Sequence, residues 1–553
     1  MASLLSRIFA YGLLAGGVTA QAEPRALRVA TFNVALNRPK AGDLLAELRG
    51  GDSAQARAVA AIIQRTRPDV LLLNEFDWDD KGEALACFVQ TYLGRGQHGE
   101  VPIEYPHQFA ASVNTGVPTG LDLDRDGTTD GPGDAFGFGT FAGQYGMAVL
   151  SRLPIARAQV RTFQKLLWRD MPDARCPEDW YSDEAKAVLR LSSKSHWDVP
   201  LAFGDATLHL LASHPTPPVF DGPEDRNGRR NADEIRFWAD YVDPTRSAWI
   251  RDDAGQRGGL AADARFVIVG DLNADPIDGD SREGAIAQLL AHPRIDATAV
   301  PTSTGGAEAA KRQGSANTTH RGDPTADTTD FTDARVGNLR LDYVLPSRGL
   351  RCLRQGVFWP TAADPTFALV GEGKDVVSSD HRLVWLDVEA PPLPDPPARP
   401  PFGELRDARF LAPFAFAEHE LTLVRWWTDT CPFCADSLPA LEGLRARYGA
   451  AGFAVVAMYH PKPPRAVPDA AVAAHAARLG VRGPLAIDAN WQKLADLQAR
   501  GAPRRATSIS VLVDRAGTIV WTHPGPRLHP GTAHPEAARA YDELRALLAD
   551  RLR

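Results

Sequence analysis

Four stretches of this sequence run from an apolar strand into side chains that can bind a metal ion or a phosphate group. The clearest is Phe266–Pro276, in which a run of apolar residues leads into a turn that carries Asp271 and Asn273. A carboxylate and a carboxamide two residues apart can face one reacting centre. The other three segments are Leu27–Asn33, Val70–Glu75 and Leu339–Leu345, and Ser379-Asp380-His381 adds further groups of the same kind. Together they indicate one dispersed site with the chemistry of phosphoester hydrolysis.

Oxygen-bearing side chains in these segments favour a hard divalent cation. Glu75 follows an apolar strand at the point where a charge first reaches solvent or a metal, and Asp380 and Asn33 supply a carboxylate and a carboxamide. Such cations take oxygen ligands. A lone glutamate after a strand more often caps a turn or a helix, but four segments of the same form in one chain favour the metal.

Two imidazoles accompany the carboxylates. His381 directly follows Asp380, and Asp342 lies in the strand-like Arg340–Leu345. A carboxylate paired with an imidazole fixes its tautomer and raises its basicity, as a general base or a charge-stabilising group requires. His214 follows the strand-like Leu208–Ser213, where a single histidine is otherwise a common surface residue.

The order of these motifs resembles that of the endonuclease/exonuclease/phosphatase family, the deoxyribonuclease-I-like superfamily. The resemblance covers about residues 27–388. Each motif is weak alone, but the complete set in order is specific. The motifs are Thr31-Phe32-Asn33, Leu73-Asn74-Glu75, Gly146–Pro154, Ser213-His214, Gly270–Pro276, Arg340–Leu345 and Ser379-Asp380-His381.

The resemblance implies an α/β fold, a four-layered α/β sandwich of two packed sheets flanked by helices, with a site that requires Mg²⁺ or Mn²⁺ at one edge. It makes Glu75 the principal metal ligand, with Asn33 and Asp380 nearby. It gives Asp271 the task of orienting or deprotonating water and Asn273 that of holding a phosphate oxygen. His381, oriented by Asp342, and His214 would stabilise or protonate the transition state, and which group acts as the base is left open.

One position departs from the pattern. Asn74 stands where many members have glutamine before the metal-binding glutamate. The amide survives with one methylene less, so we expect a shifted contact. Members of the family hydrolyse nucleic acids, inositol phosphates, sphingomyelin and other phosphoesters, so the resemblance leaves the substrate open.

An acidic segment has the spacing of a calcium loop. Asp122, Asp124, Asp126 and Asp130 occupy positions one, three, five and nine, and Gly127 stands at the sharp turn. Position twelve is a glycine, so the usual bidentate glutamate is missing, and Asp134 lies one place further on. A structural Ca²⁺ site and a solvated acidic turn are the two interpretations.

A Cys-x-x-Cys pair lies near the C-terminal end. Cys431 follows the strand-like Leu421–Trp427 and precedes a stretch with helical spacing, so it is expected at a helix N-terminus with Cys434 one turn further on. A helix N-terminus favours the thiolate, so Cys431 is predicted to be the reactive thiol and Cys434 the resolving one. A zinc site would need two more ligands, and no second cysteine pair exists.

The strand, the cysteine pair, the helix and a later hairpin signal at Ser510–Gly517 resemble a thioredoxin-like domain of the redoxin kind over about residues 404–550. In that family a proline usually faces the cysteine pair, and here Thr507-Ser508 occupies the position. The disulfide is therefore either redox-active or structural. The resemblance also implies a thiol-disulfide redox partner.

These groups must be positioned by two domains. Residues 25–388 form a large N-terminal domain in which strands such as Phe266–Val269 alternate with helical stretches such as Ala54–Arg65, which implies sheets covered by helices. Residues 389–403 are rich in proline and predict a stiff linker, and residues 404–553 form the smaller thioredoxin-like α/β domain. Lys194–Asp198 and Arg226–Arg230 are expected to be polar insertions.

Composition and charge limit the location and the partners. The 553 residues are 44% hydrophobic and 24% charged, which is typical of globular proteins. Arg7, the apolar run Ile8–Ala20 and the small residues that follow predict a secretory signal in residues 1–22, with an uncleaved anchor as the alternative. We therefore expect a periplasmic or secreted protein without a further membrane span. The net charge of −8, with −12 in residues 1–400, argues against tight electrostatic binding to nucleic acid, although bound cations would offset it.

The sequence thus predicts an exported, Mg²⁺-dependent phosphoesterase, foremost a phosphodiesterase or nuclease, joined to a thioredoxin-like domain. The substrate would be a nucleic acid, a phospholipid or an inositol phosphate. A phosphomonoesterase is the first alternative. A redox protein whose N-terminal domain only binds ligands, and a scaffold in which both domains are inactive, are the others.

Overall fold

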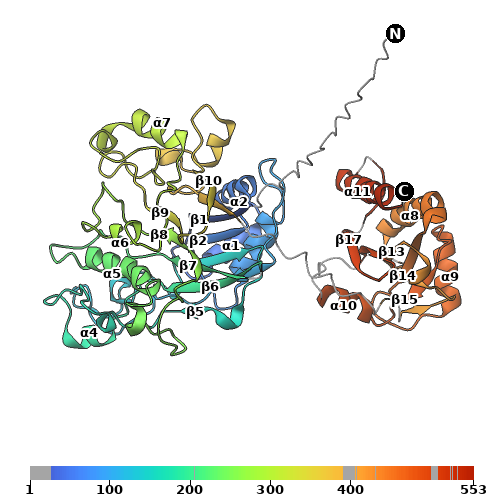
Figure 1. The fold of residues 1–553 in the computed structure, drawn as a ribbon, viewed down its shortest axis with the longest axis horizontal. Helices are drawn as coiled ribbons and strands as arrows, with labels where there is room; N and C mark the ends of the chain where they lie inside the picture. Colours follow the sequence, from blue (N-terminus) through green and yellow to red (C-terminus); the bar gives the residue numbers. More distant parts are fainter. Residues whose placement is uncertain are drawn as a thin grey trace, which may run out of the picture. The chain divides into compact units, whose positions relative to one another are not determined.

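The computed structural model describes residues 26–389 except 205, residue 405, and residues 408–552 except 430, 500–507, 524, 526, 532 and 533. The expected signal segment and nearly all of the expected linker, from residue 390 on, lie outside the described residues. The chain divides into two compact units, Met1–Leu393 and Pro394–Arg553. Figure 1 shows the elements of each unit. We describe each unit by itself.

The first sheet of the N-terminal unit has six strands in the order β10-β11-β1-β2-β4-β3. Its centre is the parallel pair of β1 and β2, whose register joins Asn33 to Asn74. The strands are β1 (Ala26–Leu36), β2 (Val70–Phe76), β3 (His107–Phe109), β4 (Met147–Ser151), β10 (Cys352–Val357) and β11 (Val384–Glu389).

The second sheet has five strands in the order β5-β6-β7-β8-β9. β7 and β8 run parallel, and β8 pairs with the antiparallel β9 so that Asp271 lies opposite Asp342. The strands are β5 (Arg161–Thr162), β6 (His196–Phe203), β7 (Ala206–Ser213), β8 (Arg265–Asp271) and β9 (Asp342–Pro346).

Successive residues of a strand point to opposite faces of its sheet, so each sheet presents one set of apolar side chains to the other. The two sheets therefore pack face to face. Leu72 and Val149 of the first sheet share a core with Val199 and Val267 of the second. The outer face of the first sheet is covered by α1 (Asp43–Gly50), α2 (Ala54–Thr66) and the turns around α3 (Glu83–Cys87). The outer face of the second is covered by α5 (Arg226–Tyr241) and α6 (Ala287–Leu290), as Figure 1 shows. The expected four-layered α/β sandwich is confirmed. The remaining helices of this unit are α4 (Asp183–Val188) and α7 (Thr304–Gln313).

The C-terminal unit is built on one six-stranded sheet in the order β12-β15-β14-β13-β16-β17. Helices pack on both of its faces, with α10 on one core and α8, α9 and α11 on two others. The strands are β12 (Arg409–Phe410), β13 (Leu421–Trp427), β14 (Phe453–Tyr459), β15 (Leu485–Ile487), β16 (Ser510–Asp514) and β17 (Ile519–His523). The helices are α8 (Pro432–Tyr448), α9 (Asp469–Arg478), α10 (Gln492–Ala499) and α11 (Pro535–Arg551). This arrangement confirms the thioredoxin-like α/β fold.

Two local expectations of polar insertions were wrong. Arg226–Arg230 form the first turn of α5, and none of these residues is exposed. Lys194–Asp198 was expected to be a polar insertion, but these residues lead into and begin β6 and are all buried. The polar side chains in this segment misled the prediction, because some of their partners come from distant parts of the chain, such as Tyr241, which donates to Asp198. Among the described residues, no helix combines the length and the apolar character needed to cross a membrane.

Candidate active site

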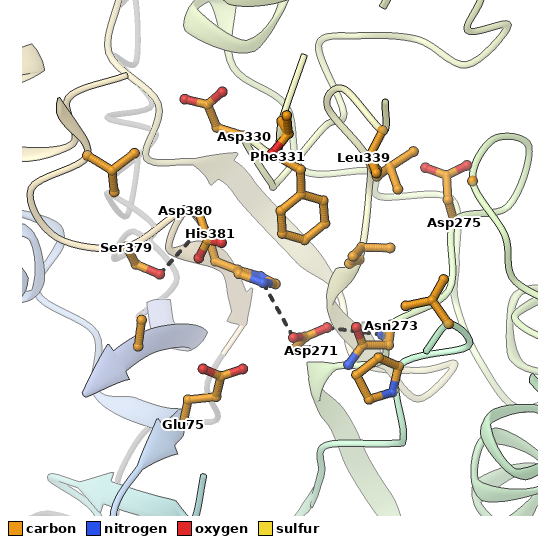
Figure 2. A pocket seen from close by; sticks show the side chains of 18 of the residues that line it. Glu75, Asp271, Asn273, Asp275, Asp330, Phe331, Leu339, Ser379, Asp380 and His381 are labelled. Atoms are coloured by element: carbon orange, nitrogen blue, oxygen red, sulfur yellow. Dashed lines mark hydrogen bonds and ion pairs between the residues drawn. The ribbon is translucent and has the colours of Figure 1, made fainter. Parts of the chain in front are cut away.

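The candidate catalytic residues come from strand ends of both sheets. β2 ends with Glu75 and Phe76, β8 ends at Asp271, and β9 begins with Asp342 on the neighbouring strand. Because the sheets pack face to face, these ends meet at one edge of the sandwich. Figure 2 shows Glu75 and Asp271 on opposite sides of a cavity, with Asp380 and His381 nearby.

A cavity of about 1470 Å³ opens above these residues. Five of the eight predicted site residues of this domain line it, namely Glu75, Asp271, Asn273, Asp380 and His381. The other three, Asn33, His214 and Asp342, are buried behind the lining. The structure thus brings all eight into one region and divides them into residues that reach the cavity and residues that support them.

Glu75 is held in an unusual backbone conformation at the edge of the cavity. Its φ of 56° lies in the left-handed region, where a non-glycine residue is uncommon and strain often marks function. Asn37 donates a hydrogen bond to Glu75 Oε2 at 2.9 Å. Burial raises the pKa of Glu75, while His381 and Asn33 oppose that rise. The carboxylate of Glu75 is costly to desolvate, and a second carboxylate, Asp380, lies close to it. Such a pair is suited to binding a cation.

Asp271 is the acceptor at the centre of the site. Its Oδ2 accepts a hydrogen bond from Asn33 Nδ2 at 3.0 Å, and its Oδ1 accepts one from the backbone N–H of Asn273 at 3.0 Å. Burial raises the pKa of Asp271 to about 7, and His381 opposes the rise. Asn273 has a φ of 52° and donates through its side chain to Pro215 O at 3.1 Å, which fixes its amide at the cavity wall.

His381 and Asp342 form a hydrogen-bonded pair. His381 Nδ1 lies 2.9 Å from Asp342 Oδ2, and Thr328 donates its hydroxyl to the same oxygen at 2.8 Å. Nε2, the other ring nitrogen, lies 3.6 Å from Asp271 Oδ2. Burial alone would lower the pKa of His381, but Asp342 and Asp271 raise it well above the usual value. The imidazole is therefore held protonated and aimed at the centre of the site.

His214 supports the site from beneath the cavity. Its Nε2 lies 3.5 Å from Asp271 Oδ2, and its side chain is only 2% exposed. Burial lowers the pKa of His214 well below the usual value, and Lys194 and His381 lower it further. His214 is therefore neutral, in contrast to His381, and it reaches the reacting centre through Asp271.

The donor set fits a hard divalent cation at Glu75 and Asp380. Both carboxylates line the cavity, and they are close enough for Asp380 to raise the pKa of Glu75. Asn33 lies beside them, but its Oδ1 already accepts from the backbone N–H of Ala35 at 3.2 Å. Asp271, Asp342 and His381 also offer ligand atoms within 4.8 Å of one another. We favour a cation at Glu75 and Asp380 over one at Asp271, Asp342 and His381, because His381 Nδ1 and Asp342 Oδ2 already bind each other.

Three supporting residues were missed by sequence reasoning. Thr328 and Asn37 lie outside the motifs, and only the structure shows that they bind Asp342 and Glu75. Lys194 is 6% exposed, and its burial lowers its pKa, whereas Glu234, Glu75 and Asp271 raise it. The sequence offered one sign of this role, because Lys194 lies two residues before the strand β6. Asn74, which stands where many members of the family have glutamine, is fully buried between the sheets. Its Oδ1 accepts hydrogen bonds from the Thr31 hydroxyl and from the backbone N–H of Asp271.

The acidic loop brings three of its four predicted ligands together. Carboxylate oxygens of Asp122, Asp124 and Asp126 lie within 4.8 Å of one another. Asp130 does not belong to this group and is exposed. Asp134 is buried and accepts from the backbone N–H groups of Leu123 and Gly131. The geometry therefore supplies three carboxylates, two exposed and that of Asp124 half-buried, while Asp134 secures the loop.

The cysteine pair lies at the start of α8, as predicted. Cys431 is the N-cap residue and half-buried, and Cys434 is fully buried. Ser508 Oγ lies 3.6 Å from Cys431 Sγ and 3.7 Å from Cys434 Sγ. Burial would raise the pKa of Cys431, but hydrogen bonds from Cys434, Ser508 and the helix backbone lower it overall, whereas burial raises that of Cys434. Ser508 thus contacts the pair directly; Thr507 lies outside the described residues.

A buried arginine underlies the cysteine pair. Arg425 of β13 has no exposed surface, and its Nη1 donates to Ser510 Oγ at 3.1 Å. Its charge lowers the pKa of Cys434, opposing the effect of burial. Burial lowers the pKa of Arg425 itself, and the two thiols oppose that fall. The signal that sequence reasoning passed over is a single charged residue within an otherwise uncharged strand.

Comparison with known proteins agrees with both domains. Residues 30–381 match the sequence model of the Endonuclease/Exonuclease/phosphatase family, and residues 412–541 match that of Redoxin. No curated protein matches the chain.

Several solved structures are similar to parts of the chain. An endonuclease/exonuclease/phosphatase from Beutenbergia cavernae DSM 12333 is 18% identical over 67% of this chain and 73% of its own, with a TM-score of 0.38. Sphingomyelinase C from Streptomyces griseocarneus is 18% identical over 66% and 98%, with a TM-score of 0.34. A protein described as thiol:disulfide interchange protein DsbE from Chlorobium tepidum is 19% identical over 26% and 96%, with a TM-score of 0.20.

Proposed function

Because the chain belongs to the endonuclease/exonuclease/phosphatase family, we propose that it is an exported, Mg²⁺-dependent phosphodiesterase. The family establishes a domain that hydrolyses phosphoesters. The proposal adds the kind of ester, the ion and the compartment. The single observation that carries it is the pairing of His381 with Asp342 at 2.9 Å beside Asp271, on a cavity that also presents Glu75.

Each residue has a task in hydrolysis. Glu75 and Asp380 would hold the cation, which when bound neutralises charge on the phosphate and on the departing oxygen. Asp271 accepts the hydrogen bond of water and its proton, since its pKa near 7 lets it exist in both forms at neutral pH. The oxygen of that water bonds to phosphorus, and one P–O ester bond breaks.

Protonated His381 balances the charge of the transition state. Its Nε2 faces Asp271 and the cavity, and Asp342 keeps Nδ1 occupied. The departing alcohol oxygen takes its proton from Nε2. His214, which is neutral and buried, holds Asp271 in place, and Asn273 presents its amide to a phosphate oxygen at the cavity wall.

A diester fits this cavity better than a terminal phosphate does. Its lining contains eight carboxylates, and the part of it that the structure describes contains no lysine or arginine. A phosphomonoester carries nearly two negative charges at neutral pH, and a diester carries one, so the diester meets less repulsion. Export is supported by Arg7 and the apolar run Ile8–Ala20.

Turnover of bis(p-nitrophenyl) phosphate and p-nitrophenyl phosphate by the purified chain tests the proposal. We expect hydrolysis of the diester that chelator abolishes and Mg²⁺ restores. Glu75→Gln should need more Mg²⁺ for the same rate. Preference for the monoester would establish the alternative, and turnover insensitive to chelator would refute the metal-dependent mechanism.

A second function is favoured by the C-terminal unit. We propose that Cys431 and Cys434 form a reversible disulfide that exchanges with a redox partner, because Cys431 has a lowered pKa and Cys434 is buried one turn away. Oxidation joins the two sulfur atoms and releases two electrons and two protons to the partner's disulfide, which becomes a dithiol.

A further inference from the structure

The mouth of the catalytic cavity carries exposed apolar side chains. Six large hydrophobic residues are exposed in the described part of the chain, and three of them lie on the loops that bear the catalytic residues. Phe220, 86% exposed, follows His214; Ile277, 47% exposed, follows Asn273; and Val377, 37% exposed, precedes Asp380. Phe220 and Val377 line the cavity, and Ile277 lies between the lining residues Asp275 and Asp278, so three separate loops carry an exposed apolar group at or beside one opening.

The loop that carries Phe220 is held in place. Asn227 donates to Val219 O at 2.7 Å, and its backbone N–H donates to Asp221 Oδ2 at 2.6 Å. Two prolines, Pro217 and Pro218, precede this point and line the cavity. Phe220 itself has a φ of 67°, which is rare and costly for an aromatic residue. A strained backbone that holds the phenyl ring of Phe220 in solvent indicates a surface that contacts an apolar partner.

The interior of the cavity is strongly acidic. Beyond the groups assigned to metal and water, its lining includes Asp275, Asp278, Asp280, Asp330 and Asp333. Asp330 is paired with Arg382 at 2.9 Å, but Asp333 Oδ1 is buried and has no hydrogen-bond partner among the described residues. Asp333 lies two residues from Phe331, whose side chain is drawn at the cavity in Figure 2.

These features disfavour a nucleic acid. Proteins bind a polyanionic backbone through lysine and arginine, and a cavity lined by carboxylates repels the phosphates that flank the one being cleaved. Asp333, whose Oδ1 has no partner among the described residues, and Phe331 both line the cavity, and a carboxylate together with an aromatic ring is suited to an ammonium group. The apolar mouth is suited to acyl chains.

We propose that the natural substrate is a zwitterionic phosphodiester lipid, taken directly from a lipid surface on which Phe220, Ile277 and Val377 rest. The cationic head group lies toward Phe331 and Asp333, and the phosphate reaches Asp271 and His381. This inference rests on the proposed phosphodiesterase function and adds its substrate class.

The test compares four probes with the full chain and Mg²⁺. They are vesicles of phosphatidylcholine with sphingomyelin, vesicles of phosphatidylglycerol, double-stranded DNA, and soluble bis(p-nitrophenyl) phosphate. We expect choline-lipid vesicles to be hydrolysed at least about tenfold faster per phosphodiester than either anionic probe, the factor expected for one ion pair formed instead of one repulsion.

Two variants with matched controls locate the effect. Phe220→Asn suits the left-handed backbone and removes the ring, so it should lower the ratio of vesicle to soluble turnover roughly 10- to 100-fold, as expected for one buried phenyl group. Phe138→Asn removes an equally apolar ring, 65% exposed, that does not line the cavity, and should leave the ratio unchanged. Asp333→Asn should reduce the preference for choline lipids over phosphatidylglycerol.

The outcomes separate the two levels of the argument. If bis(p-nitrophenyl) phosphate is not hydrolysed, the proposed function fails. If it is hydrolysed but DNA is preferred to choline lipids, the substrate class is overturned. Equal effects of Phe220→Asn and Phe138→Asn on the vesicle ratio, in variants with native melting temperatures, would overturn the lipid-contacting surface.

Discussion

The pair formed by His381 and Asp342 makes the sharpest prediction about catalysis. His381→Ala removes the imidazole, and Asp342→Asn keeps the shape of its partner but removes the charge that raises the pKa of the ring. A general acid or base contributes typically about 10²–10⁴-fold to the rate. We expect each single variant to lose activity within that range, with His381→Ala the more damaging.

The double variant distinguishes a pair from two independent residues. Asp342 meets Nδ1 at 2.9 Å and does not line the cavity, so it acts through the imidazole. Its substitution should therefore cost little once His381 is gone, and the coupling energy should nearly equal the loss in Asp342→Asn alone, about 2.7 kcal/mol for a hundredfold effect.

Steady-state hydrolysis of bis(p-nitrophenyl) phosphate at saturating Mg²⁺ measures the cycle. His209 and Asp198 provide a matched control, because their side chains pair at 2.8 Å on strands away from the cavity. His209→Ala should leave turnover unchanged. Fully additive losses in the double variant would refute the reasoning, since they would require Asp342 to act without the ring.

Three further predictions concern the metal, the acidic loop and the thiols. Glu75→Gln should weaken Mg²⁺ binding about tenfold or more, because it removes a ligand charge but keeps the shape; calorimetric titration measures this, and unchanged affinity would exclude Glu75 as a ligand. Ca²⁺ should raise the melting temperature of the chain, and Asp124→Ala should abolish the shift; a melting temperature indifferent to Ca²⁺ and chelator would leave a plain acidic turn. Cys431 should be alkylated well before Cys434 after mild reduction, and, because its pKa is lowered, the alkylation rate should rise with pH at a midpoint below that of a free thiol; mass spectrometry checks this, and equal rates would dismiss the redox-active arrangement.

The sequence allowed the layers and the convergence of the central candidate residues to be predicted, because both follow from strand periodicity. Phe266–Val269 is apolar on both faces, since it packs on the other sheet and on α5, and this pattern is visible without a structure. Asp271 then follows at the first position where the strand leaves the core. Residues that act through distant contacts give no such signal. Thr328 lies in a run of small polar residues, and only the fold brings it to Asp342.

Burial of polar residues was the main source of error. Lys194–Asp198 contains four residues with polar side chains, which favoured a solvated insertion, yet each is at most 6% exposed. Several of their partners are far away in sequence, as in the hydrogen bond from Tyr241 to Asp198. Buried polar groups are tolerated when hydrogen-bonded. Local composition cannot show whether such a partner exists.

The proposed specificity of the site arises in the same loops as its proposed chemistry but obeys different constraints. His214, Asn273 and His381 must lie at fixed positions relative to the strand ends, so their spacing can be read from the sequence. Phe220 and Ile277 lie four to six residues further along these loops, where no periodicity constrains a side chain and only the fold brings their positions together. A loop that is anchored at the catalytic end can therefore exchange its apolar tip without disturbing the hydrolytic groups. This separation explains why the reaction could be inferred from motifs, whereas the substrate class had to be inferred from the charge and the apolar mouth of the cavity.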